Sequence, residues 1–210
     1  MSPSLTTTVT SRNVVAPDVD PGAAHGYHGE LAAVLIDQDE LQAKISELAA
    51  AVAADQPADG QPPLLVCVLK GAVTFLTDFA RAMPVPVELE FMAVSSYGSA
   101  TSSSGVVRIL KDLDRDITGR RVIIVEDIID SGLTLSWLKE NLESRGAKSV
   151  RICTMLRKPE AAKIDVEVAY VGFDIPTDFV VGYGLDYAEG YRNLRDVGVL
   201  AEHVYAGTAE

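Results

Sequence analysis

The stretch Arg121-Val-Ile-Ile-Val-Glu-Asp-Ile-Ile-Asp-Ser-Gly-Leu-Thr134 decides the fold of this chain. Its apolar, β-branched run from Val122 to Val125 is typical of a strand buried on both faces of a parallel sheet. Three carboxylates follow, and then a turn, Ser131-Gly-Leu-Thr134. The turn leads into a predicted helix whose leucines share one face, at Leu135, Leu138 and Leu142. The stretch therefore predicts a central strand that ends in an acidic turn at the start of a helix.

This turn predicts an anion-binding site. The N–H groups of a first helical turn have no intrahelical partner, and the helix dipole favours negative charge beside them. The carboxylates of Glu126, Asp127 and Asp130 would repel a phosphate held directly against them. They suit a ligand that carries hydroxyls or a bound cation beside its phosphate, such as a sugar phosphate with Mg²⁺. Ordinary helix capping by Asp130 or Ser131 is the alternative explanation of the same residues.

The rest of the chain alternates apolar runs with amphipathic segments, which predicts an α/β protein with an open, mostly parallel sheet flanked by helices. Helices are expected after a cap at Asp37 or Asp39 and around Phe75–Phe79. We expect a flexible tail over 1–27, one domain over 28–205 and a frayed end over 206–210. The other strands are predicted at 31–36, 64–69, 87–94, 106–110, 150–156, 166–171 and 179–182.

Composition excludes several classes of protein. Lys and Arg number 18 against 30 Asp and Glu, so the net charge of −12 argues against a nucleic-acid surface, which would be basic. No apolar run reaches the roughly 18 residues of a membrane span, and no secretory signal is evident, so we expect a cytoplasmic protein. Cys67 and Cys153 lie in apolar runs and are expected to be small buried hydrophobes.

Two further stretches are candidates for the same edge of the sheet, because ligands bind beyond the carboxyl ends of parallel strands. Lys70-Gly71 follows the strand at 64–69, where glycine allows close approach and lysine adds charge. The alternative is a turn glycine beside a solvated lysine. Ser95–Gly105 holds small polar residues, which predicts a mobile loop. An inert linker is the alternative, and the lone aromatic Tyr97 is the residue that speaks against it.

Val125-Glu-Asp-Ile-Ile-Asp-Ser-Gly-Leu-Thr134 resembles the phosphoribosyl-pyrophosphate motif of the type I phosphoribosyltransferases. Its Ile-Ile-Asp-Ser-Gly form is similar to the 6-oxopurine branch, the bacterial-type hypoxanthine-guanine phosphoribosyltransferases. The resemblance extends from about Gly29 to about Val204. It implies that family's fold, with a small hood formed from the terminal segments.

The resemblance implies a purine salvage enzyme. Such an enzyme transfers the 5-phosphoribosyl group from phosphoribosyl pyrophosphate to N9 of hypoxanthine or guanine, giving IMP or GMP and pyrophosphate. It also implies Mg²⁺ as cofactor and a homo-dimer or homo-tetramer. The alternative is a nucleotide-sensing regulator on the same fold, although the acidic charge speaks against an RNA partner.

The resemblance also assigns roles. Asp130 is the general base that deprotonates N7 of the purine. Glu126 and Asp127 lie near the ribose and the Mg²⁺ hydration shell, although neighbouring side chains of a strand point to opposite faces, so only one should meet the ligand directly. The 5′-phosphate is expected on Ser131, Gly132, Leu133 and Thr134.

The remaining implied roles lie elsewhere in the chain. Phe179, which the pattern Phe-Val-Val-Gly alone would place in the core, is expected to stack on the purine, and Val180 to read its edge. Asp186 is the expected direct Mg²⁺ ligand. Pyrophosphate is expected on Lys70, Gly71 and Arg192, with a non-proline cis peptide in the Lys-Gly loop, and the lid on Ser96 and Tyr97.

One position departs from the family's pattern. Better-known members carry a lysine that donates to the purine 6-oxo group, five residues before the glycine of Gly172-Phe-Asp-Ile-Pro. Here that position is Glu167, which cannot donate when ionised. Lys163, Lys158 or a backbone N–H are the candidate substitutes, and the preference among hypoxanthine, guanine and xanthine stays open.

Overall fold

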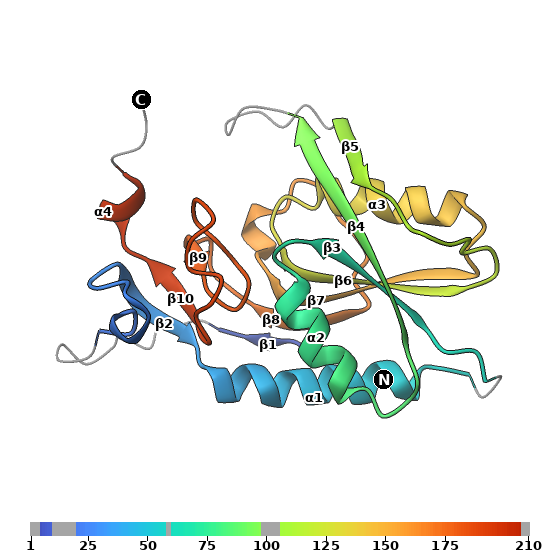
Figure 1. The fold of residues 1–210 in the computed structure, drawn as a ribbon, viewed down its shortest axis with the longest axis horizontal. Coiled ribbons are helices and arrows are strands. Elements are labelled where there is room, and N and C mark those ends of the chain that lie inside the picture. The colour runs from blue at the N-terminus through green and yellow to red at the C-terminus, as the bar shows by residue number, and fades with distance from the viewer. Residues whose placement is uncertain (1–4, 10–19, 58–59, 98–105, 207–210) are drawn as a thin grey trace.

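The main sheet confirms the predicted α/β class. In this computed structural model, which describes residues 5–9, 20–57, 60–97 and 106–206, seven strands pair in the order β1-β8-β7-β6-β3-β4-β5 (Figure 1). All neighbours are parallel except β4 and β5, which are antiparallel. The strands are β1 Thr7–Thr8, β3 Leu64–Leu69, β4 Glu88–Tyr97, β5 Val106–Lys111, β6 Arg121–Ile129, β7 Ser149–Arg157 and β8 Tyr170–Asp174.

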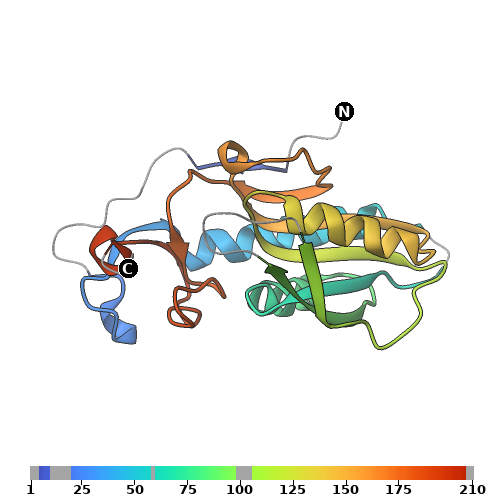
Figure 2. The ribbon, with the colours of Figure 1, turned by 90° about the horizontal axis from the view of Figure 1, so that it is seen from above.

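Helices cover both faces of this sheet. Helices α1 (Gln38–Ala54) and α2 (Val73–Ala82) lie on one face and α3 (Leu133–Ser144) on the other (Figures 1 and 2). Asp37 begins α1 with a capping box, since its side chain accepts the Glu40 N–H and the Glu40 side chain accepts the Asp37 N–H. Gly146, at φ +78°, follows the C-cap of α3, where glycine adopts the left-handed conformation at little cost.

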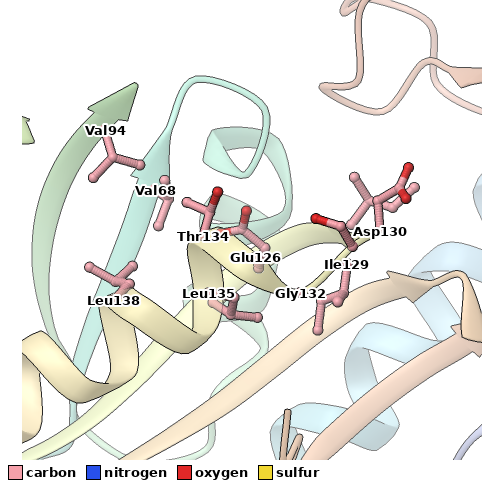
Figure 3. Close-up of a pocket in the computed structure, with 11 residues that line it drawn as sticks. Val68, Val94, Glu126, Ile129, Asp130, Gly132, Thr134, Leu135 and Leu138 are labelled. Atoms are coloured by element: carbon pink, nitrogen blue, oxygen red, sulfur yellow. The ribbon is translucent and has the colours of Figure 1, made fainter. Parts of the chain in front are cut away.

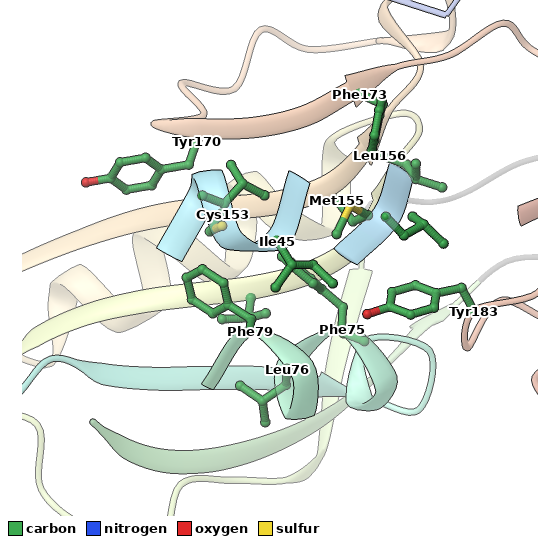
Figure 4. Packing of buried hydrophobic residues seen from close by; sticks show 14 of the residues in the cluster. Ile45, Phe75, Leu76, Phe79, Cys153, Met155, Leu156, Tyr170, Phe173 and Tyr183 are labelled. Carbon is green, nitrogen blue, oxygen red and sulfur yellow. The ribbon is translucent and has the colours of Figure 1, made fainter. Parts of the chain in front are cut away.

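The strand alternation sorts side chains into two cores. On β6, Ile123 and Val125 join the core under α1 and α2, with Phe75 and Phe79 of α2 (Figure 4). Val122 and Ile124 face the leucines of α3. Strand β6 is therefore buried on both faces, and residues that continue its alternation are directed to opposite sides of the sheet.

A second, smaller sheet forms the predicted hood. Strands β2 (Leu31–Ile36), β10 (Val197–Leu200) and β9 (Val180–Val181) pair antiparallel in the order β2-β10-β9. The short helix α4 (Glu202–Tyr205) follows β10, and two 3-10 helices, η1 and η2, span Ala23–His25 and Pro159–Ala161. The hood lies beside the main sheet at the left of Figures 1 and 2.

Several predicted boundaries were wrong. The strand predicted at 166–171 is β8, which begins at Tyr170 and includes Gly172 and Phe173, because Val166 and Val168 instead pack against the core of α3. The strand at 179–182 is not the last, since β10 pairs with it. Strand β4 continues to Tyr97 and pairs with β5, so the loop predicted from Ser95 begins later; residues 98–105 lie outside the described part.

Parts of the predicted flexible tail are ordered. Strand β1 pairs with β8, and Leu5 and Val9 pack against the core. Tyr27 stacks on Tyr191 with ring centroids 4.2 Å apart. The strand pairing and the tyrosine stack were not predicted because each joins residues more than 160 positions apart in the chain. The rest of 1–19 and residues 207–210 lie outside the description, and the single domain over 28–205 stays a prediction.

Both cysteines are buried and free, as predicted. Burial, with Glu126 and then Asp127 nearby, raises the pKa of the Cys67 thiol to about 12. Burial likewise raises the pKa of Cys153. Over the described residues, no helix is long and apolar enough to cross a membrane.

Candidate active site

A first cavity, of about 250 Å³, opens where β6 gives way to α3 (Figure 3). Most of the acidic turn singled out in the sequence faces it. It is lined by Val68, Val94, Glu126, Ile128, Ile129, Asp130, Ser131, Gly132, Thr134, Leu135 and Leu138.

Gly132 shapes the mouth of this cavity. It is the N-cap of α3 at φ +77°, and no side chain caps the helix. A Cβ at this position would lie 3.2 Å from the carbonyl oxygen of Ile164. The backbone at Gly132 therefore passes close to the loop that contains Ile164. Capping by Asp130 or Ser131 is therefore wrong, and the N–H groups of the first turn of α3 lack intrahelical acceptors.

Glu126 and Asp127 point to opposite faces of the sheet, as predicted. Glu126 lines the first cavity, and its buried Oε2 has no hydrogen-bond partner in the described part of the chain. Burial and then the charge of Asp127 raise the pKa of Glu126 well above its usual value. Both Glu126 and Asp127 are half-buried.

Asp127 faces a second cavity, of about 320 Å³. Its Oδ1 accepts the Ile128 N–H at 2.8 Å, and burial raises its pKa to about 6. This cavity unites residues from four separate segments of the chain. It is lined by Lys70, Gly71, Asp127, Ile128, Asp130, Lys158, Phe179, Val180, Leu185, Asp186 and Arg192.

Ile128 and Asp130 line both cavities, so the two are adjacent across the end of β6. Asp130 is exposed, and its Oδ2 lies 3.8 Å from the Nζ of Lys158, a lysine that is only 9% exposed. A carboxylate with a nearby buried cation thus stands at the boundary between the first and second cavities.

Three cationic side chains border the second cavity, each beside a carboxylate: Lys158, described above, Lys70 and Arg192. Lys70 pairs with Glu189 at 3.1 Å, which holds the pKa of that carboxyl below its usual range. Arg192 pairs with Asp186 at 2.8 Å and donates to the Gly184 carbonyl at 2.8 Å. Arg192 lies in the loop between β9 and β10, outside any helix.

Two loops nest tightly at this cavity. The Leu69–Lys70 peptide is cis, as the resemblance implied for this loop. A Cβ on Gly71 would lie 1.8 Å from the Oδ2 of Asp127, and one on Gly184 would lie 2.2 Å from the Gly71 carbonyl oxygen. Only glycine at both positions allows β6, the Lys70 loop and the Asp186 loop to approach this closely.

Phe179 is 40% exposed, so its placement in the core from sequence pattern alone was wrong. Leu133 lines neither cavity, and Lys163 and Glu167 are exposed and also outside both. The side chains of Ser96 and Tyr97 lie outside the described part.

Lys158 was considered from the sequence only as a possible substitute donor, and Leu185 was given no role, yet both line the second cavity. Lys158 directly follows β7, and a lysine after a buried strand is the same signal that singled out Lys70. Leu185 carries no local signal, because an apolar residue in a loop acquires its role from the loop's placement.

The comparisons decide the family. A model of the phosphoribosyl transferase domain matches residues 37–188, which include six of the seven strands of the main sheet and every residue that lines the two cavities except Arg192. The chain belongs to the phosphoribosyltransferase family.

Named relatives of this phosphoribosyltransferase agree with the domain match. A hypoxanthine-guanine phosphoribosyltransferase of Mycobacterium bovis is 60% identical over 192 residues, covering 89% of this chain and 95% of the relative. One of Bacillus subtilis is 51% identical over 172 residues, covering 82% and 94%. The crystal structure of a hypoxanthine phosphoribosyltransferase from Staphylococcus aureus superposes with a TM-score of 0.81 at 40% identity, covering 90% and 99%.

Proposed function

We propose that this chain is a purine salvage enzyme that transfers the 5-phosphoribosyl group from phosphoribosyl pyrophosphate to N9 of hypoxanthine or guanine. The products are IMP or GMP and pyrophosphate. The observation that carries the proposal is the pair of cavities that meet at Asp130: one has an uncapped helix start, and the other has cations and an exposed aromatic ring.

The first cavity suits the 5-phosphoribosyl group. The backbone N–H groups from Ser131 to Thr134 and the Ser131 and Thr134 hydroxyls supply donors for a phosphate. Leu133 would contribute its N–H alone, since its side chain lies outside the cavity. The unpartnered oxygen of Glu126 suits a ribose hydroxyl, which can donate to it.

Asp130 is the proposed general base. A base that accepts the N7 proton must lie beside the purine and near C1′, and Asp130 lines both cavities. The Nζ of Lys158 lies 3.8 Å from the Asp130 carboxylate, on the side of the second cavity. N9 can then attack C1′ as the bond to pyrophosphate breaks.

The second cavity suits the purine and pyrophosphate. Phe179 offers an exposed ring for stacking, and Leu185 an apolar surface. Lys158 is the better candidate for the donor to the purine 6-oxo group, because it lines the cavity and Lys163 does not. Lys70, Gly71 and Arg192 would bind pyrophosphate. Ser96 and Tyr97 are the proposed lid that excludes water.

Mg²⁺ fits the donors at this end of the sheet. Asp186 places one carboxylate in the cavity, and the oxygens of pyrophosphate would complete the shell that this ion prefers. Glu126 and Asp127 would act through water or the ribose. When bound, the ion would neutralise charge on the departing pyrophosphate.

Incubation of the chain with the donor, Mg²⁺ and each of hypoxanthine, guanine, xanthine and adenine tests the proposal. We expect nucleoside monophosphate from hypoxanthine or guanine, and loss of product on chelation of Mg²⁺. Nucleotide binding without product from any 6-oxopurine would favour the nucleotide-sensing regulator.

We also propose a cytoplasmic location and a homo-dimer or homo-tetramer. Light scattering on the purified chain checks the assembly, and a mass of one 22.4 kDa chain would contradict it.

A further inference from the structure

Phe179 has aromatic neighbours that come from the end of the chain and from the Asp186 loop. The ring of Tyr205 stacks on Phe179, with centroids 5.4 Å apart and planes inclined by 24°. Tyr187 meets the same ring edge-on, at 5.6 Å and 88°. Both geometries are those that aromatic pairs prefer.

Neither of the two tyrosines that contact Phe179 belongs to the lining of the second cavity. Phe179 lines that cavity, whereas Tyr187 and Tyr205 do not. Phe179 therefore lies between the two tyrosines, which its ring contacts, and the space proposed for the purine, which it lines.

The segment that carries Tyr205 also holds the backbone of Phe179. The Leu200 N–H donates to the Phe179 carbonyl at 2.9 Å, and α4 follows β10 immediately. The Ala201 N–H donates to Glu30 at 2.8 Å, and Val204 packs in the hood core. The Tyr205 ring is thereby placed by the same hydrogen-bonded strand that places Phe179.

We propose that Tyr205 is a positioning residue for the purine: stacked against Phe179, it holds that ring in the orientation that receives the base. The proposal rests on the proposed function, because it takes a base stacked on Phe179 as given. An exposed phenylalanine otherwise exchanges between rotamers, and ordering it only on binding lowers affinity. Tyr205 thus acts on purine binding, and the donor site at α3 does not depend on it.

The test is steady-state kinetics of Tyr205→Leu, with the KM for each substrate and kcat measured separately. Loss of one aromatic pair should raise the KM for hypoxanthine about three- to tenfold. The KM for the donor and kcat should stay within about twofold. Tyr205→Phe keeps the ring and should behave as the unmodified chain.

His203→Ala is the matched control, since His203 is exposed on the same helix. It should leave all three constants unchanged. A double-mutant cycle adds a second readout: with Phe179→Leu already in place, Tyr205→Leu should cause no further rise in the purine KM. Additive effects would show that Tyr205 acts by another route and would overturn the proposal.

Other results also overturn it. A lower purine KM in Tyr205→Leu would mean that Tyr205 competes with the base for the ring, and an unchanged one would remove any role. A rise in the KM for both substrates together with a fall in kcat would indicate general damage to the hood. If the leucine variant melts below the assay temperature, Tyr205→Met is assayed with the same expectations. An unmodified chain that yields no nucleotide would instead refute the proposed function.

Discussion

Asp130 is the residue on which the proposed chemistry depends most. Asp130→Asn keeps the size of the side chain and removes the base, so we predict that kcat falls by roughly 10²-fold or more while donor binding persists. Asp165→Asn is the control, because Asp165 is exposed and lines neither cavity. Single-turnover assays separate chemistry from product release, and a near-normal rate in Asp130→Asn would remove the assigned role.

Asp127 gives a prediction about stability and pH. Burial raises its pKa to about 6, above the value of an unfolded chain, so its ionisation opposes folding. This penalty is fully present above about pH 6 and disappears below about pH 4. We therefore expect Asp127→Asn to raise the melting temperature at pH 7.5 by a few degrees. The gain should vanish at pH 4, and a gain that does not depend on pH would contradict the explanation.

Lys158 and Lys163 can be separated by experiment. Lys158 is buried at the second cavity, and Lys163 is exposed outside it. We predict that Lys158→Ala raises the KM for hypoxanthine and guanine by about tenfold or more, through loss of a charge-assisted hydrogen bond, while Lys163→Ala leaves both unchanged. The opposite pattern would make Lys163 the donor to the 6-oxo group.

At the scale of elements, the site depends on loops that pack backbone against backbone. Gly184 has φ +99°, and its Cα faces the Gly71 carbonyl. A methyl group on Gly184 would therefore force apart the loop that carries Asp186 and the loop that carries Lys70. Gly184→Ala should lower kcat/KM for the donor at least about tenfold. Gly119→Ala is matched for positive φ (+73°) but meets no atom within 4 Å. It should cost about 1 kcal/mol of stability and no activity. Equal kinetics in the two variants would refute this account of the loops.

At this scale, the sequence predicted the features that depend on neighbouring residues and missed those that depend on distant ones. The junction from β6 to α3 and the opposite directions of Glu126 and Asp127 follow from local periodicity, and both were predicted correctly. The start of β8 was wrong because Val166 and Val168 pack against α3, a tertiary contact that overrides their strand propensity. Strand β10 is a four-residue run that gains its partners only from distant β2 and β9.

The candidate site was predictable where a motif carried it. The turn at Ser131–Thr134 and Lys70-Gly71 could be proposed from residue types at strand ends. Phe179, Asp186 and Arg192 required the family resemblance, since each reaches the second cavity through a loop. The contact of Tyr205 with Phe179 had no sequence signal, because it depends on the pairing of β10 with β9.

At the scale of the whole molecule, the N-terminal segment stabilises the edge of the main sheet. The Leu5 carbonyl accepts from the Nζ of Lys44 at 3.0 Å, and Lys44 is only 7% exposed. Removal of residues 1–9 would leave this amine with fewer partners and expose the edge of β8. We expect the melting temperature to fall by several degrees.

Lys44→Met tests the cause of that loss. Lys44→Met removes the buried charge. It should therefore raise the melting temperature of the chain that lacks residues 1–9, and change that of the full chain little. Differential scanning calorimetry of the four proteins measures this coupling. Identical effects of Lys44→Met in both backgrounds would show that the Leu5 contact is not responsible.

The central claim is that the end of β6 and the start of α3 bind the sugar phosphate of a purine nucleotide. A crystal structure of the chain with GMP tests it most directly. We predict the 5′-phosphate within about 3 Å of the N–H groups of Ser131–Thr134, with the base on Phe179 and near Asp130. A phosphate bound elsewhere, with these N–H groups facing only water, would contradict the account.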